Sequence, residues 1–439
     1  MKFGTHPRIP MLAKTRSKTM RTQCLLILLG FCFYSAGSAE AWPGDGHIKY
    51  DFLATKSPAA NMFGVRDDAL LLNHGLELRL NTGTKKGAWS ANASYQLQAV
   101  HDDQLGLQSG TFGAQVASPS TGDSQRWLNL SEVLSETDDD RFLHRLDRLT
   151  IGYRSSRSVI KLGRQAISWG NGLVYNPMDF LNPFDPAAID TEYKTGEDML
   201  YWQQLQDSGN DLQVIAIGRR NAAGSRTNED ASLALKYHAL IGVRGFDLLL
   251  AEHRGDSIIA AGFNSPVGSA VARGDWVSTR VDGQTYNSLV ANISYSWVAL
   301  NRNVSGHLEY FRNGFGIRQG RYQQLLSSSH LPLRQRLQRN ELFTVGREYL
   351  AASVTLEMTP LWSLSPSLFY NLSDNSGMLQ LAARHNMQQN LQLLSAIVVP
   401  AGPSGTEFGG LDLAAAGDGM GLTDVSISWA AFAQLGVYF

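Results

Sequence analysis

Apolar and polar side chains alternate, one residue after the other, in long runs along most of the chain. In residues 89–99, for example, Trp89, Tyr95 and Leu97 share one face, and only Ser, Asn and Gln occupy the other. Residues 286–298 and 347–358 repeat the pattern. Strands of water-soluble sheets usually run for about 5–6 residues, and these runs are roughly twice as long. The pattern therefore predicts β-strands that cross a bilayer, with lipid on one face and a polar lumen on the other.

Eighteen such runs are present, with 16 strands as the alternative count, and an even number suits a bacterial barrel. The expected strands are residues 47–55, 69–82, 87–101, 143–156, 158–168, 197–206, 210–220, 230–240, 242–252, 256–265, 268–282, 285–298, 303–313, 346–359, 363–374, 377–386, 389–400 and 425–439.

The connections between these strands alternate in length. Long connections fall at 56–68, 102–142, 169–196, 314–345 and 401–424, always on the same side of the count. Short turns in the periplasm and long loops outside are typical of outer-membrane barrels. We therefore predict an all-β fold in which residues 42–439 form a single antiparallel transmembrane β-barrel.

The N-terminus has the pattern of a secretory signal peptide. Basic residues precede an apolar run over 24–34 and a small-residue stretch, which predicts cleavage after Ala39 or Ala41. Cys24 and Cys32 both lie in this segment, so residues 42–439 contain no thiol for a disulfide or a metal. The expected location is the outer membrane of a Gram-negative bacterium, in contact with lipid and lipopolysaccharide.

The last strand ends on an aromatic residue, Phe439, which resembles the signal read by the outer-membrane assembly machinery. The formal net charge is −1, without a concentrated basic stripe, so nucleic acid is not an expected partner. We find no motif for catalysis, for a nucleotide or metal cofactor, or for any other cofactor. The chain is therefore not expected to be an enzyme.

Assigning the apolar face to lipid leaves a polar lumen whose walls carry charged and amide side chains. The candidate pore-lining residues are Arg79, Arg148, Lys161, Gln165, Arg219, Glu309, Arg347, Glu357 and Arg384. The connection 169–196 is rich in Pro and Asn and is the candidate constriction loop. Its candidate residues, with the arginine that precedes it, are Arg164, Trp169, Asp179, Asp185, Asp190, Glu192 and Lys194.

Two arrangements of this loop stay open. If it folds inward, its carboxylates form an acidic edge that faces a more basic wall, and the constriction carries a transverse field. If it lies at the outer rim, the same carboxylates bridge lipopolysaccharide through divalent cations or cap turns.

Leu162-Gly163-Arg164-Gln165, followed by Ser168-Trp169-Gly170 and Asn176-Pro177-x-Asp179, resembles the Gly-Arg-Gln signature of the alginate-export family of outer-membrane barrels. The resemblance is specific over this segment and implies an 18-stranded, porin-like channel. The arginine-lined pore of such a channel passes an anionic or polar solute.

Arg164 departs from simple alternation, because it shares its parity with the lipid-facing Leu162. Either a bulge near Gly163 turns its side chain inward, or the side chain lies above the bilayer. We expect it to pair with an acid of its own loop, such as Asp179, and a rim arginine is the alternative.

The leading hypothesis is a channel for diffusion or export of a small polar or anionic solute. The second is a scaffold barrel for a partner protein or for polymer-export machinery, which predicts an open lumen with loop 169–196 outside. The third is an outer-membrane hydrolase, which predicts a Ser, a His and an acid clustered at the barrel rim.

Overall fold

The computed structural model describes residues 44–56, 70–103, 123–221, 223–318, 322, 328–410 and 427–439. The predicted signal peptide, residues 1–41, lies outside this part of the chain. Within it, no helix is long and apolar enough to cross a membrane.

Nineteen strands occur in the described residues. They are β1 (Gly44–Lys56), β2 (Leu70–Lys86), β3 (Trp89–Asp102), β4 (Ser131–Glu136), β5 (Asp140–Arg154), β6 (Ser158–Gln165), β7 (Glu197–Leu205), β8 (Asp211–Ile217), β9 (Ser232–Ile241), β10 (Arg244–His253), β11 (Asp256–Val267), β12 (Ala270–Val281), β13 (Gln284–Ala299), β14 (Arg302–Arg312), β15 (Glu348–Thr359), β16 (Trp362–Asn371), β17 (Ser376–Gln388), β18 (Leu391–Ala401) and β19 (Trp429–Tyr438). The helices are η1 (Asp123–Gln125), η3 (Ser328–His330) and α2 (Leu331–Gln338).

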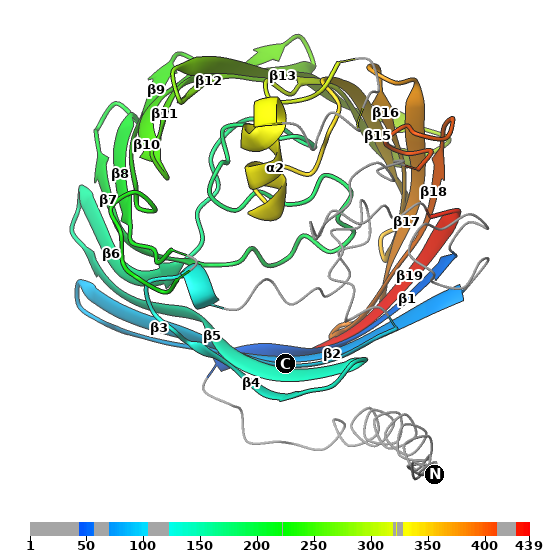
Figure 1. Ribbon diagram of the computed structural model, residues 1–439, viewed down its shortest axis with the longest axis horizontal. Helices are drawn as coiled ribbons and strands as arrows, with labels where there is room; N and C mark the ends of the chain where they lie inside the picture. The colour runs from blue at the N-terminus through cyan, green and yellow to red at the C-terminus, as the bar shows by residue number, and fades with distance from the viewer. Residues whose placement is uncertain are drawn as a thin grey trace, which may run out of the picture. The chain divides into compact units, whose positions relative to one another are not determined.

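The strands form a closed antiparallel barrel (Figure 1). Each ring strand pairs with its neighbours in sequence, and β1 closes the ring by pairing with β19 as well as β2, with His47 opposite Tyr438. Apart from β4, the ring has 18 strands, and each coincides with one of the predicted runs. The all-β barrel and its strand number are confirmed.

Strand β4 was not predicted, because it falls inside the expected loop 102–142. It pairs with the N-terminal half of β5, from Ser131 opposite Arg145 to Glu136 opposite Arg141, while β6 pairs with the C-terminal half. The preceding residues, 123–130, extend from β4 past the loop ends of the short strands β6 and β7, since Arg126 forms a bridge with Arg219 just after β8. At the loop end, the barrel wall beside β6 and β7 is therefore formed by the connection between β3 and β5.

Short hairpin turns join the strands at one end of the barrel, here called the turn end; the long connections lie at the opposite, loop end. Between β13 and β14, at the turn end, Leu300 and Asn301 have φ of 51° and 57°. Both residues in the left-handed region give the tight two-residue turn that matches the twist of paired strands.

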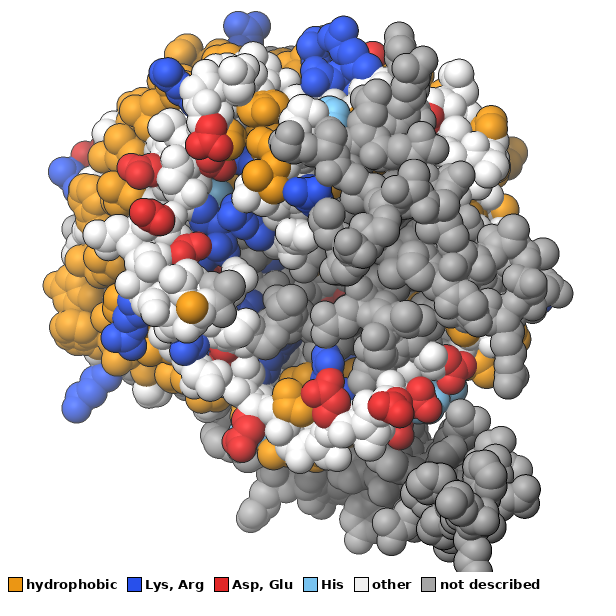
Figure 2. Space-filling view, in the orientation of Figure 1, with side chains coloured by type: hydrophobic (Ala, Val, Ile, Leu, Met, Phe, Trp, Pro, Cys, Tyr) orange, Lys and Arg blue, Asp and Glu red, His pale blue; other side chains and the backbone are white. Residues whose placement is uncertain are grey.

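The outer face of the barrel is apolar and exposed. In β10, Leu248 and Leu250 are 60% and 54% exposed, whereas Asp247 and Leu249, which alternate with them, are buried. Figure 2 shows apolar side chains along the outer wall of β6 to β10. A contiguous exposed apolar band of this kind is the surface that lipid covers in outer-membrane barrels.

Candidate functional site

The connection between β6 and β7, residues 166–196, runs inside the barrel (Figure 1). We call it the lumen loop. Its backbone and side chains contact β1, β10, β12, β14, β17 and β19, which surround the lumen. Its path makes it the central feature of the candidate site.

The first anchor of the lumen loop is the carboxylate of Glu309 on β14. It accepts three hydrogen bonds from consecutive backbone N–H groups, those of Leu173 at 2.6 Å, Val174 at 3.1 Å and Tyr175 at 2.7 Å. The side-chain amide of Asn292 donates to the same carboxylate at 3.0 Å. Hydrogen bonds to an ionised acceptor are stronger than neutral ones, so this wall residue fixes the loop backbone.

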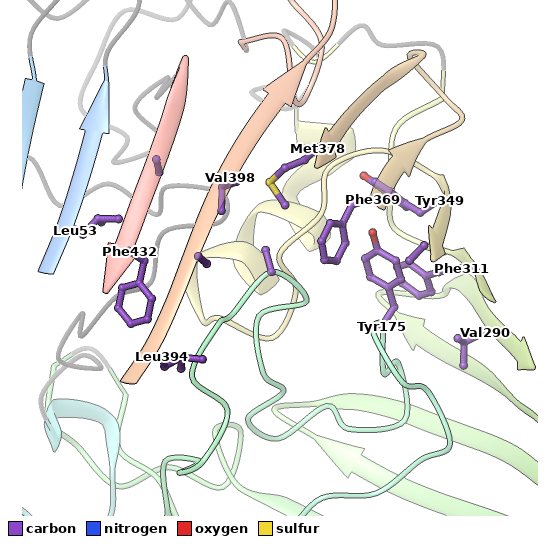
Figure 3. Packing of buried hydrophobic residues seen from close by; sticks show 14 residues of the cluster. Leu53, Tyr175, Val290, Phe311, Tyr349, Phe369, Met378, Leu394, Val398 and Phe432 are labelled. Carbon is purple, nitrogen blue, oxygen red and sulfur yellow. The ribbon is translucent and has the colours of Figure 1, made fainter. Parts of the chain in front are cut away.

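Apolar packing supports the Glu309 anchor. The ring of Tyr175 stacks on Phe311 with centroids 4.7 Å apart and an angle of 12°, and it also packs against Tyr349 (Figure 3). Tyr175 is 4% exposed and belongs to a buried cluster that extends along the inner face to Phe432. The lumen on this side is therefore filled by side chains of the loop and the wall.

The second anchor joins Asn171 to β12 and β10. The backbone N–H of Asn171 donates to Asp275 at 2.6 Å, and its side-chain amide donates to Asp275 at 2.7 Å and Asp247 at 3.3 Å. Gly170 has a φ of 99°, and a Cβ there would collide with the side chain of Asn176. This turn needs glycine both for its backbone angle and for the close approach.

The third anchor lies where β1 and β19 close the barrel. The ammonium of Lys49 contacts Asp190 and Glu192 of the loop, each at 2.7 Å, and Gln434 donates to Asp190 at 2.8 Å. Burial acts to raise the pKa of Asp190, but the adjacent Lys49 holds it below its usual range. On the neighbouring wall, Gln380 donates to the backbone carbonyl of Ala187 at 2.9 Å.

Within the lumen loop, the ammonium of Lys194 pairs with the carboxylate of Asp179 and donates to the carbonyl of Ile167 at 2.7 Å. Burial lowers the pKa of Lys194 and raises that of Asp179, and the mutual attraction of the two charges opposes both shifts. Among the residues that the structure describes, no cation pairs with Asp185. Burial raises its pKa to about 6, and the hydrogen bond from the Ala187 N–H opposes the shift.

The expectation of an acidic loop edge that faces a basic wall across a constriction is therefore wrong. Asp179, Asp190 and Glu192 are each bound to a lysine. The wall, in turn, presents the carboxylates of Asp275 and Glu309 to the loop. The loop carboxylates hold the loop in place, and two of them contact the basic wall residue Lys49 directly, with no opening between them.

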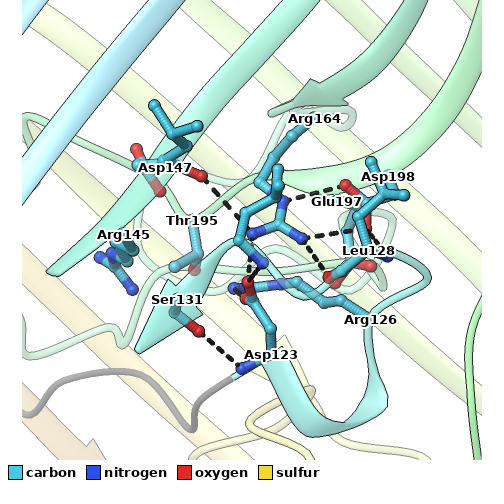
Figure 4. A network of polar contacts seen from close by, with 12 residues as sticks. Asp123, Arg126, Leu128, Ser131, Arg145, Asp147, Arg164, Thr195, Glu197 and Asp198 are labelled. Atoms are coloured by element: carbon cyan, nitrogen blue, oxygen red, sulfur yellow. Dashed lines mark hydrogen bonds and ion pairs between the residues drawn. The ribbon is translucent and has the colours of Figure 1, made fainter. Parts of the chain in front are cut away.

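Arg164 is fully buried at the loop end of β6, under residues 123–130 (Figure 4). Its guanidinium contacts Asp198 of β7 at 2.9 Å and Asp123 of η1 at 2.6 Å, and it donates to the carbonyl of Leu128 at 2.8 Å. The expected partner, Asp179, was wrong. Burial acts to raise the pKa of Asp123, but the Arg164 guanidinium, with Arg126, holds it below its usual range. Arg164 thus fixes residues 123–130, in the connection between β3 and β5, to the barrel wall.

The predicted pore-lining residues separate into two groups. Four arginines hold backbone or acidic partners: Arg79 pairs with Asp147, Arg148 binds Asp147 and the carbonyl of Lys194, Arg219 pairs with Glu197, and Arg347 donates to the carbonyls of Gly314 and Gly316. Glu309 anchors the lumen loop. The remaining residues face the lumen nearer the turn end: Gln165, Lys161, Glu357 and Arg384.

Three residues that matter for the lumen loop were not among the candidates: Asp275, Lys49 and Tyr193. Alternation places Asp275 on the inner face of its strand, so that signal was present in the sequence. Tyr193 lies under the guanidinium of Arg79, 4.0 Å from it, and nothing in the local sequence indicates this contact.

A Ser, a His and an acid do cluster at the loop end. The hydroxyl of Ser232 lies 2.8 Å from Nδ1 of His253, whose Nε2 lies 3.1 Å from Glu341. Ser232 is only 4% exposed, however, and its oxygen also accepts a hydrogen bond of 2.6 Å from Arg219. A nucleophile needs an exposed oxygen, so this geometry favours a structural tie between Glu341 and the wall.

Below the lumen loop, toward the turn end, lies a cavity of about 620 Å³. Loop residues 166–169 form one side of it, and the inner faces of β5 to β9 form the rest, together with the turn-end residues of β2 and β3. Gln165 and Lys161, both predicted to line the pore, lie on its wall. The described residues contain no group of three or more His, Cys, Asp or Glu side chains able to hold a metal ion.

No protein-family model matches the chain, and no curated protein sequence does. Solved structures do. The chain has the fold of large outer-membrane barrels. It is similar to Wzi, an Escherichia coli outer-membrane protein of group 1 capsule assembly described as a carbohydrate-binding β-barrel, with a TM-score of 0.52 and 10% identity over 95% of this chain and 88% of that one.

It is also similar to OccK5 (OpdH) of Pseudomonas aeruginosa, with a TM-score of 0.51 and 9% identity over 90% of this chain and 98% of that one. For Pseudomonas aeruginosa OpdK, solved with vanillate, the TM-score is 0.50 and the identity 10%, over 90% and 97% of the two chains. At these identities the likeness concerns the fold alone. The resemblance to alginate-export barrels stays a prediction.

Proposed function

We propose that the chain is an outer-membrane channel through which a small polar or anionic solute diffuses, with the lumen loop as its constriction. The position of this loop carries the proposal, because a long connection anchored across the lumen narrows any path through the barrel. The scaffold hypothesis predicts the same loop outside the barrel, so the anchors at Glu309, Asp275 and Lys49 favour the channel.

The fold is consistent with this proposal. OpdK, one of the similar barrels, was solved with the small aromatic acid vanillate, and another, Wzi, is described as carbohydrate-binding. Under the proposal, residues 1–41 direct secretion, Phe439 is read by the assembly machinery, and lipopolysaccharide surrounds the loop end.

Planar-bilayer conductance tests the proposal. The wild-type chain should form channels of defined conductance, and a variant lacking residues 171–195 should show a larger conductance with weaker ion selectivity. The control is Arg157→Gln, which alters an exposed ion pair at the turn end and should conduct as wild type does.

If the deletion leaves the conductance unchanged, the lumen loop is not the constriction. If neither chain conducts although both fold in vesicles, the barrel is not a channel.

A further inference from the structure

Strands β1 and β19 form the seam of the barrel, where the ring closes. They pair from His47 opposite Tyr438 to Lys56 opposite Trp429 and lie side by side in Figure 1. Every other pair of neighbouring ring strands is joined directly by a turn or a loop-end connection, whereas β1 and β19 are joined only through the rest of the barrel. The seam can therefore open without any change in a turn, and opening it exposes the backbone groups of two edge strands.

Two carboxylates of the lumen loop each contact both seam strands. Asp190 accepts a hydrogen bond of 2.7 Å from Lys49 on β1 and one of 2.8 Å from Gln434 on β19. Glu192 lies 2.7 Å from the same Lys49 ammonium, and it accepts a hydrogen bond of 2.9 Å from the hydroxyl of Tyr438 on β19. The two side chains therefore cross the seam on the inner face of the barrel and join its strands at two positions.

Burial makes these contacts costly to lose. Lys49 is 3% exposed, and among the described residues its ion-pair partners are Asp190 and Glu192. A buried ammonium without an opposite charge is strongly destabilised, so the seam is less stable when the lumen loop is not docked. By the same linkage, the loop is less stable on the wall when β19 separates from β1, because each carboxylate then loses one of its two partners.

We propose that Asp190 and Glu192 form a latch that holds the seam closed from inside, so that docking of the lumen loop and closure of the ring stabilise each other. The backbone ladder between β1 and β19 remains when the latch is removed, so the barrel still forms but its seam opens more often. The inference goes beyond the proposed function, because it concerns how the ring stays closed whether or not a solute passes through it.

Hydrogen–deuterium exchange of the full chain folded into lipid vesicles, read by mass spectrometry, tests the latch. Asp190→Asn combined with Glu192→Gln keeps the shape of both side chains and leaves the buried Lys49 without an opposite charge. We expect the backbone amides of β1 and β19 to exchange at least about tenfold faster than in the wild type. The amides of β12 and β13, away from the seam, are the internal reference and should exchange as in the wild type.

The matched control is Asp185→Asn. Asp185 lies in the same loop, and among the described residues its carboxylate accepts the N–H of Ala187 and contacts neither seam strand. The same substitution there should leave the exchange of the seam amides unchanged. Asp190→Asn alone leaves Glu192 to pair with Lys49 and should accelerate the seam amides about threefold. This single variant decides the case if the double variant does not fold.

Three results would overturn the latch, even if the chain conducts. The seam amides could exchange as in the wild type, the amides of β12 and β13 could accelerate equally, or Asp185→Asn could have the same effect as Asp190→Asn. The second result would mean a general loss of stability, and the third a general effect of charge in the lumen loop. Selective acceleration at the seam in a chain that forms no channels supports the latch and removes the proposed function.

Discussion

Glu309, on β14, accepts a hydrogen bond of 2.7 Å from the backbone N–H of Tyr175, in the middle of the lumen loop. The two residues are 134 positions apart in sequence. A wall carboxylate that binds backbone N–H groups fixes the loop whatever side chains the loop carries. This contact makes the lumen loop part of the barrel wall and not a free segment.

Replacing Glu309 with Ala removes the acceptor of three backbone N–H groups. We expect the loop to loosen locally, at a cost of roughly 1–3 kcal/mol for each buried donor that water does not satisfy. Single-channel recordings should then show a larger conductance and more current noise. The control is Asp207→Ala, because the carboxylate of Asp207 is exposed and pairs with Arg157 at the turn end, away from the lumen loop. Recordings of Glu309→Ala identical to those of wild type would contradict this role.

The buried guanidinium of Arg164 predicts a large effect on stability. Arg164→Met leaves the carboxylates of Asp123 and Asp198 without their common cation, and breaking a buried pair in this way costs about 3–5 kcal/mol. Denaturant unfolding from lipid vesicles measures the loss. Arg157→Met removes an exposed ion pair with Asp207, and it should cost less than about 1 kcal/mol. Equal losses in the two variants would mean that the Arg164 network is not a structural tie.

The strands were predictable because the period of two is a local property of the sequence. Each strand residue faces either lipid or lumen, and this choice is visible in its own side chain. Leu248 and Asp247 show it directly, one exposed to the outside and the other buried inside. The same rule placed Glu309 and Lys161 on the inner face.

The partners of these residues were not predictable. Glu309 binds backbone N–H groups, which every residue except proline has, so no residue type marks the contact. Arg164 binds Asp123, which lies in another connection 41 residues away. Which carboxylate meets it depends on the path of residues 123–130 across the barrel wall, and local periodicity does not contain that path.

Asp185 makes the stability of the lumen loop depend on pH. Burial raises its pKa from 3.8 to about 6, so between these values the folded state keeps a proton that the unfolded state releases. Stability therefore falls as pH rises from about 4 to 6, by at most about 3 kcal/mol before screening by water. Asp185→Asn keeps an acceptor for the Ala187 N–H and should remove this part of the pH dependence.

Unfolding measured at pH 4, 5, 6 and 7 for the two chains provides the test. The wild type should lose stability relative to Asp185→Asn across pH 4 to 6, and the difference should stay constant above pH 7. Parallel curves over the whole range would show that Asp185 titrates in the folded state as it does in the unfolded state.

We predict that serine-directed reagents do not label Ser232 in its cluster with His253 and Glu341. Because Ser232 is 4% exposed and its oxygen accepts a hydrogen bond from Arg219, a fluorophosphonate reagent should not modify it in the folded chain. Mass spectrometry of the treated protein reads this out, with a known serine hydrolase as the positive control. Stoichiometric modification of Ser232, absent in Ser232→Ala, would restore the hydrolase hypothesis.

The outward face of β10 tests whether hydrocarbon surrounds the barrel. Leu248 lies near the middle of this strand and is 60% exposed, so Leu248→Arg places a charge at the depth where lipid is most apolar. The expected cost is about 2–4 kcal/mol for folding into vesicles. Leu300→Arg is the matched control, since Leu300 is 93% exposed in a turn between strands and a charge there meets water. If both variants fold into vesicles as wild type does, lipid does not cover the outer face of β10. The proposal of a membrane channel would then be wrong.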